Sequence, residues 1–559
     1  MVSTKKIRPL GAVFAALVFC PAMLMPKAAA AAQSEPPKER RITVFYTGSV
    51  QGTLEPCGCN SDPLGGLDRF TGLVRSAARK GPVLLVDAGN LLYPTAGVPA
   101  NKRDAGRLRA AFVVKQMEAL GLAGSPVGEG DLALGTSGLG RFRLSANLKL
   151  EGIAASRIVT VGKIRVGLFG IADPDAAQMA GLPAENPVSV AVATSAELRK
   201  QGAEVVIALV ALDRAGARRI AARTNIDFVI YGKHTGEGLE KAARVGESTL
   251  LAAGEELQRA GRLDLIIRTA GPIADAGSPE ETTRRQEQLT EKIGLLKAQL
   301  DRWKKGEKGT DSGFVASKTA ELSAAEAERQ TLGGTTWQAP VTGSYFVNRL
   351  IRIQRVLPQD KGVTSGMRSL DKAIGKVNLK QAVAPPVAKP GRATFVGQKA
   401  CASCHKEATA FWKKTVHASA WGTLVDGGKD LDLECVSCHV TGYGEVGGSA
   451  LGFTRNLESV QCETCHGPGS IHVAEKGLED PPAVRVETPE TTCLGCHNEK
   501  HSDTFAYDAY LRDILGPGHG KARRARLGQG PTGGELRRAA MARARDTGKQ
   551  TLQHAARGL

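Results

Sequence analysis

Long hydrophobic runs are nearly absent from this chain of 559 residues. A helix that spans a bilayer needs about 20 consecutive, predominantly apolar residues. The stretch from Leu10 to Met25 is too short for such a span, and no other run of eighteen apolar residues occurs. This absence argues against an integral membrane protein, so we expect the mature chain to be soluble.

Cysteine is equally scarce outside one stretch of the chain. Of the eleven cysteines, eight lie between residues 401 and 496. Cys20 lies in the N-terminal apolar run, which leaves only Cys57 and Cys59 elsewhere. Cysteine chemistry is therefore concentrated in one region, apart from a single short loop.

Aromatic residues do not interleave the basic segment 521–559, which is rich in Arg, Gly and Ala. The whole chain has 74 Lys and Arg against 56 Asp and Glu, a formal charge of +18 that could indicate nucleic acid or an anionic membrane. Proteins that bind single-stranded nucleic acid use aromatic side chains for stacking, and here these are missing. We predict a disordered basic tail that binds no nucleic acid, with a patch for an acidic partner or a membrane surface as the alternative.

The N-terminus has the features of an export signal. Small-residue cleavage sites follow the apolar run at Ala28–Ala32, and basic residues precede it at Lys5, Lys6 and Arg8. We predict a cleaved signal peptide over residues 1–32 and a periplasmic or other extracytoplasmic location.

The motif C-x-x-C-H occurs four times between residues 401 and 497. The copies are Cys401-Ala-Ser-Cys404-His405, Cys435-Val-Ser-Cys438-His439, Cys462-Glu-Thr-Cys465-His466 and Cys493-Leu-Gly-Cys496-His497. This motif attaches c-type haem, because two thiols add across the vinyl groups and the adjacent histidine becomes the proximal iron ligand. Zinc knuckles are the rival interpretation, but four copies with the histidine in register favour haem. We therefore predict four haem c groups, with His405, His439, His466 and His497 as proximal ligands.

The remaining histidines supply candidates for the distal ligands: His417, His472, His519 and His501. One residue spans at most about 3.6 Å, so a histidine close in sequence to a proximal ligand cannot easily pass round the same haem edge. His501, and less firmly His472, would therefore serve a neighbouring haem, and such cross-ligation would hold the porphyrins in a close cluster. His519 lies in a Gly-Pro-Gly-His-Gly turn that can approach a ring closely. A solvated surface histidine is the alternative for His501, and His554 in the basic tail is the weakest candidate.

The block from Arg41 to about Ala270 alternates predicted strands with helices. Helical patterns at Arg107–Leu120 and Ser195–Gln201 separate six short, apolar, β-rich runs. These runs are Ile42–Tyr46, Val83–Val86, Arg165–Ile171, Val205–Val210, Phe228–Tyr231 and Leu263–Ile267. The segment Val161-Gly-Lys-Ile164 is typical of a tight hairpin turn. This pattern predicts an α/β fold or layered sandwich.

Five segments of this block resemble motifs of the periplasmic nucleotidases, which belong to the calcineurin-like metallophosphoesterases. They are Val44–Gly52, Leu84–Asn90, Val127–Asp131, Ser145–Leu148 and Gly232–Thr235. The resemblance covers roughly residues 41–270 and implies the sandwich fold of that family. It also implies a dinuclear metal centre, built from D-x-H, G-D, G-N-H-[DE] and G-H-x-H, that activates water against a phosphate ester.

This chain departs from that family at nearly every metal ligand. The departures are Ser49, Gln51, Asn90, Glu129, Gly130, Ala211, Lys233 and Thr235, with His234 displaced by one position. Hard divalent cations need carboxylates and imidazoles. We therefore predict a non-hydrolytic domain with lost metal ligands. A metal-dependent 5′-nucleotidase or phosphoesterase is the alternative.

One loop of this block contains two cysteines with potentially reactive thiols, the segment Leu54-Glu-Pro-Cys57-Gly-Cys59-Asn60. It is either a structural loop with inert thiols or a strained local disulfide, or a redox dithiol that faces the haems. The loop resembles one in nucleotidase-like exported proteins, some of which carry selenocysteine in the corresponding C-G-C loop. That resemblance implies redox or soft-metal chemistry, so Cys57 and Cys59 are candidate redox residues.

The composition changes from residue 278 onward. Leu289, Ile293, Leu296, Leu300 and Trp303 form a heptad stripe, which predicts a helical hairpin over 278–333 or, alternatively, a short coiled coil. A strand and helix extension over 336–380 and a stiff, proline-rich linker over 381–394 follow.

The segment after the linker resembles the tetrahaem cytochromes of the cytochrome c-554 type. Besides the four motifs, Trp412 with His417-Ala-Ser-Ala, Cys438–Gly442 and Cys465–His472 carry this resemblance, which covers about residues 395–520. It implies a mostly α-helical and irregular multihaem domain. Because few aliphatic residues lie between the motifs, the porphyrins would form most of its core, and removing haem should unfold it.

Together these patterns predict an exported multihaem c-type cytochrome that passes electrons between redox partner proteins or membrane electron-transfer complexes. Its expected fold class is an α/β layered sandwich, a helical hairpin insert and a mostly α-helical or irregular cytochrome domain. Iron with two histidines is saturated and suits electron transfer, whereas a haem without a distal ligand can bind a small molecule. A haem-dependent reductase or oxidase of a small nitrogen or sulfur species is therefore the alternative.

Overall fold

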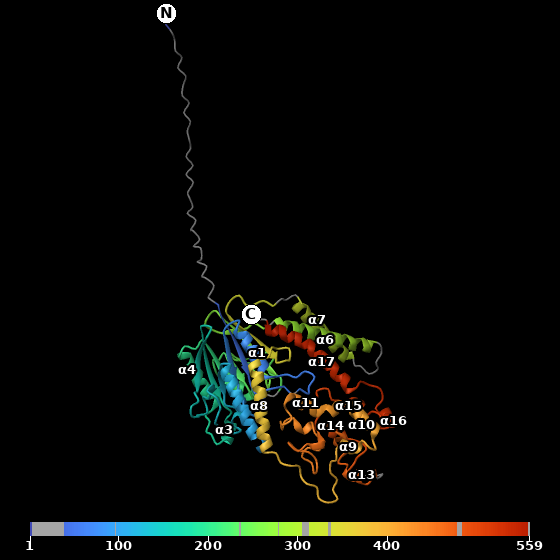
Figure 1. The fold of residues 1–559 in the computed structure, drawn as a ribbon. Coiled ribbons are helices and arrows are strands. Elements are labelled where there is room, and N and C mark those ends of the chain that lie inside the picture. The colour runs from blue at the N-terminus through green and yellow to red at the C-terminus, as the bar shows by residue number, and fades with distance from the viewer. Residues whose placement is uncertain are drawn as a thin grey trace. The chain divides into compact units, whose positions relative to one another are not determined.

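The computed structural model describes residues 1–2, 39–56, 58–94, 97–233, 236–277, 279–304, 312–333, 337–477 and 483–556. The predicted signal peptide lies outside these residues except for its first two positions, and so do Cys57, His234 and Thr235. Residues 39–559 form one compact unit (Figure 1). Within the described residues, no helix combines the length and the apolar character needed to cross a bilayer.

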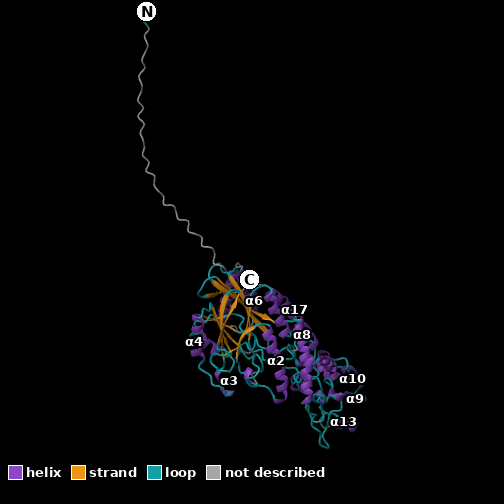
Figure 2. Cartoon of the chain, turned by 60° about the vertical axis from the view of Figure 1, so that its left-hand side comes forward, coloured by secondary structure: helices purple, strands orange, loops and turns teal. Residues whose placement is uncertain are grey.

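The strands form two mixed sheets (Figure 2). The first has the order β12-β13-β11-β1-β2-β3-β4 and the second the order β5-β6-β7-β8-β10-β9. Their bounds are β1 Arg40–Thr47, β2 Val83–Asp87, β3 Leu122–Pro126, β4 Arg143–Leu144, β5 Ser156–Val161, β6 Ile164–Ile171, β7 Val205–Val210, β8 Phe228–Tyr231, β9 Ala243–Val245, β10 Ser248–Leu251, β11 Arg259–Ile267, β12 Ile273–Asp275 and β13 Ser344–Arg352.

Helices cover the outer faces of both sheets, which gives four layers. The bounds are α1 Leu67–Ala78, α2 Arg103–Ala119, α3 Pro174–Met179, α4 Pro187–Lys200, α5 Arg214–Ala221 and α8 Lys361–Lys380. Helices α1, α2 and α8 pack on the first sheet through Phe70, Val113 and Ile374. Helices α4 and α5 pack on the second sheet through Leu198 and Ile220. The predicted layered α/β sandwich is confirmed.

The inner core lies between the two sheets. Strands alternate their side chains between two faces, so β1 directs Val44 inward, where it meets Leu168 and Ile207 of the facing sheet in one buried cluster. Phe228 and Phe346 meet edge to face across this layer, with ring centroids 5.2 Å apart. Strand β7 is buried along its whole length, as expected for an interior parallel strand that is covered on both faces.

Two local predictions can be compared with the backbone directly. Gly162 and Lys163 have φ values of 55° and 67° between β5 and β6, as a two-residue hairpin turn of the primed type requires. The hairpin of α6 (Pro279–Lys304) and α7 (Ser312–Gly333) forms as predicted, and ion pairs such as Arg285–Glu328 at 2.7 Å join its two helices.

The chain then returns to the first sheet through β13. This strand pairs antiparallel with β11 and parallel with β12, so it is an interior strand of the sheet. The sequence pattern indicated a strand here but did not show which sheet it joins, because pairing partners far apart in sequence leave no local signal.

The haem-motif region consists of short helices joined by irregular segments, in agreement with the predicted class. Its helices are α9 Gln398–Cys401, α10 Lys406–Trp412, α11 Ala420–Gly427, α12 Cys462–His466, α13 Ser470–Ala474, α14 Glu490–Leu494 and α15 Tyr507–Ile514.

The described part of the basic segment, residues 521–556, is largely helical and not disordered, contrary to the prediction. It forms α16 (Lys521–Arg526) and α17 (Gly533–Ala556). Ala540 and Thr551 of α17 are buried, and the Thr551 hydroxyl donates a hydrogen bond to Gln354. Ala and Arg are strong helix formers. A helix with one face of small residues becomes stably ordered when that face packs on another surface. Composition alone could not show that the sandwich supplies this surface.

Candidate functional site

The four C-x-x-C-H motifs each fold into a helical turn. In the first, the backbone N–H of His405 donates to the Cys401 carbonyl at 2.9 Å, and in the fourth His497 donates to Cys493 at 2.7 Å. The third motif is helix α12, and the second contains the 3₁₀ turn Val436–Cys438. A helical turn brings the two thiols and the imidazole of each motif close together, as attachment to one porphyrin requires.

Backbone carbonyl groups orient two of the proximal imidazoles. Nδ1 of His439 lies 2.6 Å from the Ala420 carbonyl oxygen, and Nδ1 of His466 lies 2.8 Å from that of Arg485. A carbonyl can only accept, so each Nδ1 carries the proton and Nε2 is left as the metal ligand. Nδ1 of His497 lies 3.1 Å from the Ser502 hydroxyl, which can serve the same purpose.

Two predicted distal histidines face proximal histidines of other motifs. The ring centroids of His405 and His472 are 6.3 Å apart with planes inclined by 26°, and those of His417 and His497 are 6.1 Å apart with planes inclined by 44°. Two imidazoles on opposite sides of one metal, each bound at about 2 Å, would have centroids about 6 Å apart. Both pairs therefore fit axial ligation of a haem iron.

His519 lies beside the third motif. Burial lowers the pKa of His519, and the neighbouring His466 is among the charges that lower it further. The turn that carries His519 needs glycine, because a Cβ on Gly518 would lie 2.5 Å from the backbone nitrogen of Ala408. Among the described residues, Nδ1 of His519 and Nδ1 of His472 are buried without a hydrogen-bond partner.

His417 is prepared for metal binding by its surroundings. Burial lowers the pKa of His417 to about 4, and the charge of His497 acts in the same direction. Its imidazole is therefore neutral near pH 7, which is the form that binds a metal.

The second motif has His501 as its nearby distal candidate. His501 lies close enough to Cys438 for its charge to help lower the pKa of that thiol to about 6, although the hydrogen bond with Cys496 is the larger cause. This proximity agrees with the prediction that His501 serves a haem other than that of its own motif. The side chain of His554 lies outside the described residues.

Thiols of different motifs are in contact with one another. Cys401 and Cys462 share a hydrogen bond that raises the pKa of Cys401 and lowers that of Cys462. Cys438 and Cys496 share another. Burial raises the pKa of Cys465 to about 11, and the nearby Cys493 adds to this shift. The first motif thus adjoins the third, the third adjoins the fourth, and the fourth adjoins the second.

The predicted loss of the phosphoesterase metal site has a structural counterpart in Lys233. Its ammonium group lies 2.9 Å from the Asp173 carboxylate and 3.1 Å from that of Glu129. The hydrogen bond with Asp173 is the largest cause that raises the pKa of Lys233. Lys233 and Glu129 occupy two of the ligand positions of the resembled family, so an ion pair joins residues where that family has a metal centre. Asp173 was missed by the sequence analysis, since it belongs to none of the motifs.

The other replaced positions form close backbone packing. The backbone N–H of Ser49 donates to the Gly89 carbonyl at 2.9 Å, and that of Gln51 donates to Asn90 at 2.8 Å. Ser49, Gln51 and Asn90 have φ values of 49°, 57° and 55°. Gly89 itself lies against Ala211, whose Cβ would be 2.9 Å from a Cβ at position 89. The described residues contain no group of three or more His, Cys, Asp and Glu side chains that could hold a metal ion.

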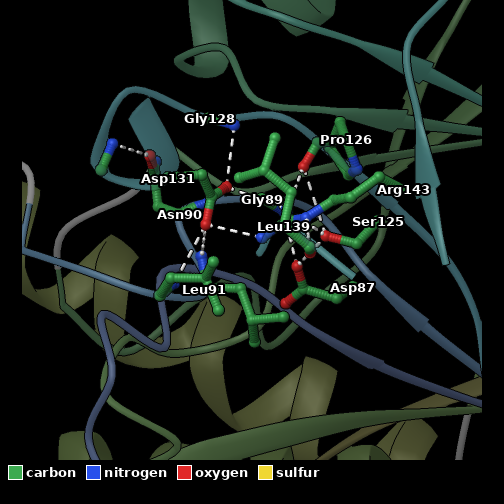
Figure 3. A network of polar contacts seen from close by, with 12 residues as sticks. Asp87, Gly89, Asn90, Leu91, Ser125, Pro126, Gly128, Asp131, Leu139 and Arg143 are labelled. Carbon is green, nitrogen blue, oxygen red and sulfur yellow. Dashed lines mark hydrogen bonds and ion pairs between the residues drawn. The ribbon is translucent and has the colours of Figure 1, made fainter. Parts of the chain in front are cut away.

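A buried network holds these loops together (Figure 3). The guanidinium of Arg143 donates to both oxygens of Asp131, at 2.9 and 2.7 Å, and neither side chain is exposed. The Asp131 carboxylate also accepts backbone N–H groups from Asn90, Leu91, Leu92 and Gly128. Arg143 precedes the Ser145–Leu148 motif, and the sequence analysis missed its role because it belongs to none of the resembled motifs.

The C-G-C loop is anchored to the haem-motif region on both sides of its cysteines. Glu55 forms an ion pair with Lys429 at 2.7 Å, and the backbone N–H of Ser61 donates to Asp503 at 3.0 Å. Cys59 is exposed, and its carbonyl accepts a hydrogen bond from Arg537. Because Cys57 lies outside the described residues, a redox role for this loop stays a prediction.

Comparison with known proteins assigns part of this region. Residues 400–467 match the family model described as cytochrome c554 and c-prime. The matched segment contains the first three C-x-x-C-H motifs and ends before the fourth. Over 93 residues the chain is 41% identical to cytochrome c-554 of Nitrosomonas europaea, a match that spans 14% of this chain and 40% of that protein. The match thus covers less than half the length of that relative. The resemblance to the cytochrome c-554 type that the sequence predicted is confirmed for this segment.

Solved structures similar to the chain include the 5′-nucleotidase precursor of Thermus thermophilus, with 17% identity, a TM-score of 0.42 and coverage of 64% of this chain and 63% of that one. The calcineurin-like phosphoesterase YfkN of Bacillus subtilis has 20% identity, a TM-score of 0.35 and coverage of 42% and 86%. The sulfate thiohydrolase SoxB of Thermus thermophilus has 19% identity, a TM-score of 0.34 and coverage of 40% and 53%.

The pairing of His405 with His472 leads to a spectroscopic prediction. Replacing His472 with alanine should leave one iron without its distal imidazole, so that haem should become high-spin while the others keep their spin state. Absorption and electron paramagnetic resonance spectra of the purified protein would measure this change. Spectra identical to those of the wild-type protein would show that His472 is not a ligand.

Proposed function

We propose that this chain is an exported electron-transfer cytochrome that holds four haem c groups through its four C-x-x-C-H motifs. The observation that carries the proposal is the placement of His472 and His417 opposite the proximal histidines His405 and His497, at centroid distances of 6.3 and 6.1 Å. These distances suit two axial imidazoles on one iron. Bound haem c supplies an iron that cycles between Fe(III) and Fe(II).

The residues of this chain hold the porphyrins and the imidazole ligands in fixed positions. The eight motif cysteines hold the porphyrins, and carbonyl partners of Nδ1 keep the imidazoles of His439 and His466 in one orientation. We assign His519 as the distal partner of His466, since Nδ1 of His519 is buried without a hydrogen-bond partner and the charge of His466 helps to lower the pKa of His519. Ligands held in this way change little between the two oxidation states, so little reorganisation opposes electron transfer.

Contacts between the motifs support one order in which electrons pass from haem to haem. The thiol contacts link the first motif to the third, the third to the fourth and the fourth to the second. Haems attached there would have adjacent edges in the same order. The first and second haems would then be the two ends of the series.

The nucleotidase-like part would serve as a scaffold rather than as a hydrolase. Lys233 and Glu129, which form an ion pair, stand at two positions where the resembled family has groups of its metal centre, and Asp173 pairs with the same lysine. Ion pairs such as Arg109–Asp432 at 2.9 Å join the sandwich to the segment before the second motif.

Electron counting tests the proposed function. We expect the purified protein, after expression with export and cytochrome maturation, to contain four haems per chain and to take up four electrons. Pyridine haemochrome quantification and an anaerobic reductive titration would measure both numbers. A colourless preparation that contains zinc would contradict the proposal.

A second candidate function depends on the distal side of the second haem, where His501 is the nearby candidate ligand. If His501 does not bind this iron, the open position could take a small nitrogen or sulfur species, as a reductase or oxidase requires. Cyanide should then shift the absorption of one haem in four, and replacing His501 with alanine should leave that shift unchanged. If cyanide binds only after His501 is replaced, His501 is a ligand and this candidate fails.

A further inference from the structure

One side of the haem-motif region contacts the sandwich, and another side carries basic residues. Segments next to the second and fourth motifs are joined to the sandwich. Lys429 and Asp432 pair with Asp371 and Arg109 at 2.7 and 2.9 Å. Lys500, close to the fourth motif, pairs with Glu256 at 2.6 Å. These contacts place the second and fourth haem sites against the sandwich.

The first and third motifs border a strongly basic surface instead. Helix α10 begins directly after His405, and α16 begins just after His519 (Figure 1). Helix α10 contacts the turn that precedes α16, since a Cβ on Gly516 would lie 2.2 Å from the Phe411 ring. We call the exposed surface of these two helices and the residues that flank them the α10–α16 face.

The α10–α16 face carries seven basic and two acidic side chains. The basic residues are Lys406, Lys413, Lys414, Lys521, Arg523, Arg524 and Arg526, and the acidic ones are Glu407 and Glu487. Glu487 already pairs with Arg523 at 3.0 Å and with Arg526 at 3.5 Å. The other basic groups, apart from half-buried Arg523, are exposed, so the face has a clear excess of positive charge.

Arg523 ties this charge to the third haem site. Its guanidinium donates to the Val486 carbonyl at 2.5 Å. Arg485, which precedes Val486, donates to the Cys465 carbonyl at 2.7 Å, and the Arg485 carbonyl orients His466. The positive charge of Arg523 is therefore linked to the third proximal ligand, His466, through the segment Arg485-Val486. A charge of one sign beside a redox centre attracts partners of the opposite sign and raises their rate of association.

We propose that the α10–α16 face is the docking surface for an acidic electron-transfer protein, which exchanges electrons with the haems of the first and third motifs. The inference rests on the proposed haem assignment and adds to it a partner class and a point of entry. One electron passes from the partner's reduced centre to a ferric haem, so the partner is oxidised by one electron and no bond is broken. An acidic protein is favoured over a membrane because the positive groups flank the haem sites themselves.

Charge reversal in the full-length, haem-loaded protein tests this surface. The test variant carries Lys413→Glu, Lys414→Glu and Arg524→Glu, none of which is an assigned ligand. The matched control carries Arg218→Glu, Arg219→Glu and Arg223→Glu, three exposed residues at or just after α5. Both variants change the net charge equally. The probe is a reduced, acidic plant-type ferredoxin, a low-potential one-electron donor that can reduce a ferric haem.

Stopped-flow mixing would measure the second-order rate constant of haem reduction. We expect the test variant to be slower by about tenfold or more at low ionic strength, with the difference shrinking at high salt. The control should change by less than about twofold, since α5 packs on the second sheet, whereas the haem-motif region contacts α2 and α8 on the first sheet. An equal loss in both variants, or none in either, would overturn the docking face. Binding to anionic phosphatidylserine vesicles that the test reversals abolish, with the ferredoxin rate unchanged, would overturn it in favour of a membrane. Lack of haem in the wild-type protein would instead overturn the proposed function.

Discussion

Replacing both Cys493 and Cys496 with serine is expected to lower the haem content of the protein from four to three per chain. The fourth motif lies beyond the segment that matches the cytochrome family model, so this variant tests the count of four directly. Each haem c depends on the thiols of its own motif, and without them the porphyrin has no covalent attachment. Pyridine haemochrome quantification against protein concentration would measure the change.

Cys59→Ser is the matched control, because Cys59 lies outside the four motifs. It should leave four haems per chain. A count that is the same in the motif variant and in the control would show that the fourth motif holds no haem. The motif variant should also slow electron exchange between the first and second haem sites, because the fourth motif adjoins both the second and the third.

Arg143→Met is expected to destabilise the sandwich by roughly 3–5 kcal/mol, because it leaves the Asp131 carboxylate buried without its ion-pair partner. Both side chains of this pair are fully buried, with 0% exposure. Arg143 also donates to the Leu139 carbonyl at 3.0 Å and to the Ser125 hydroxyl at 2.9 Å, so the variant removes further hydrogen bonds. Urea unfolding followed by circular dichroism would measure the loss.

Arg141→Met provides the control for this prediction. Arg141 is 94% exposed, and its ion-pair partner Glu118 is 3.8 Å away. A surface pair of this kind contributes little, so we expect a change within about 0.5 kcal/mol. Combining Arg143→Met with Asp131→Asn should recover part of the stability, since the amide removes the unpaired charge while its oxygen can still accept backbone N–H groups. If the double variant is no more stable than Arg143→Met, the cost comes from lost packing and not from the buried charge.

The same network explains how the nucleotidase-like part keeps its fold without the metal ligands of the resembled family. Asp131 accepts hydrogen bonds from four backbone N–H groups of the loops at the replaced ligand positions. Arg143 balances its charge, and Lys233 balances Glu129 and Asp173 nearby. The cationic side chains of Arg143 and Lys233 thus neutralise the carboxylates of Asp131, Glu129 and Asp173.

The sequence by itself determined the four C-x-x-C-H motifs and the layered sandwich. Each C-x-x-C-H motif is complete within five residues, so its chemistry can be predicted without knowing what surrounds it. Local apolar, β-rich runs predicted the strands, and a short segment predicted the hairpin turn at Gly162 and Lys163. All of these signals act over a few residues, where propensity and spacing dominate.

The tertiary structure alone decided which histidines face each other, which motifs adjoin, and where the basic C-terminal helices pack. His472 reaches His405, and His417 reaches His497, only because distant segments fold together. Helix α17 is ordered because the sandwich offers Gln354 and its neighbours as a surface. Burial, ion pairing and axial ligation are properties of groups brought together in space, and their energies depend on partners that no local pattern specifies.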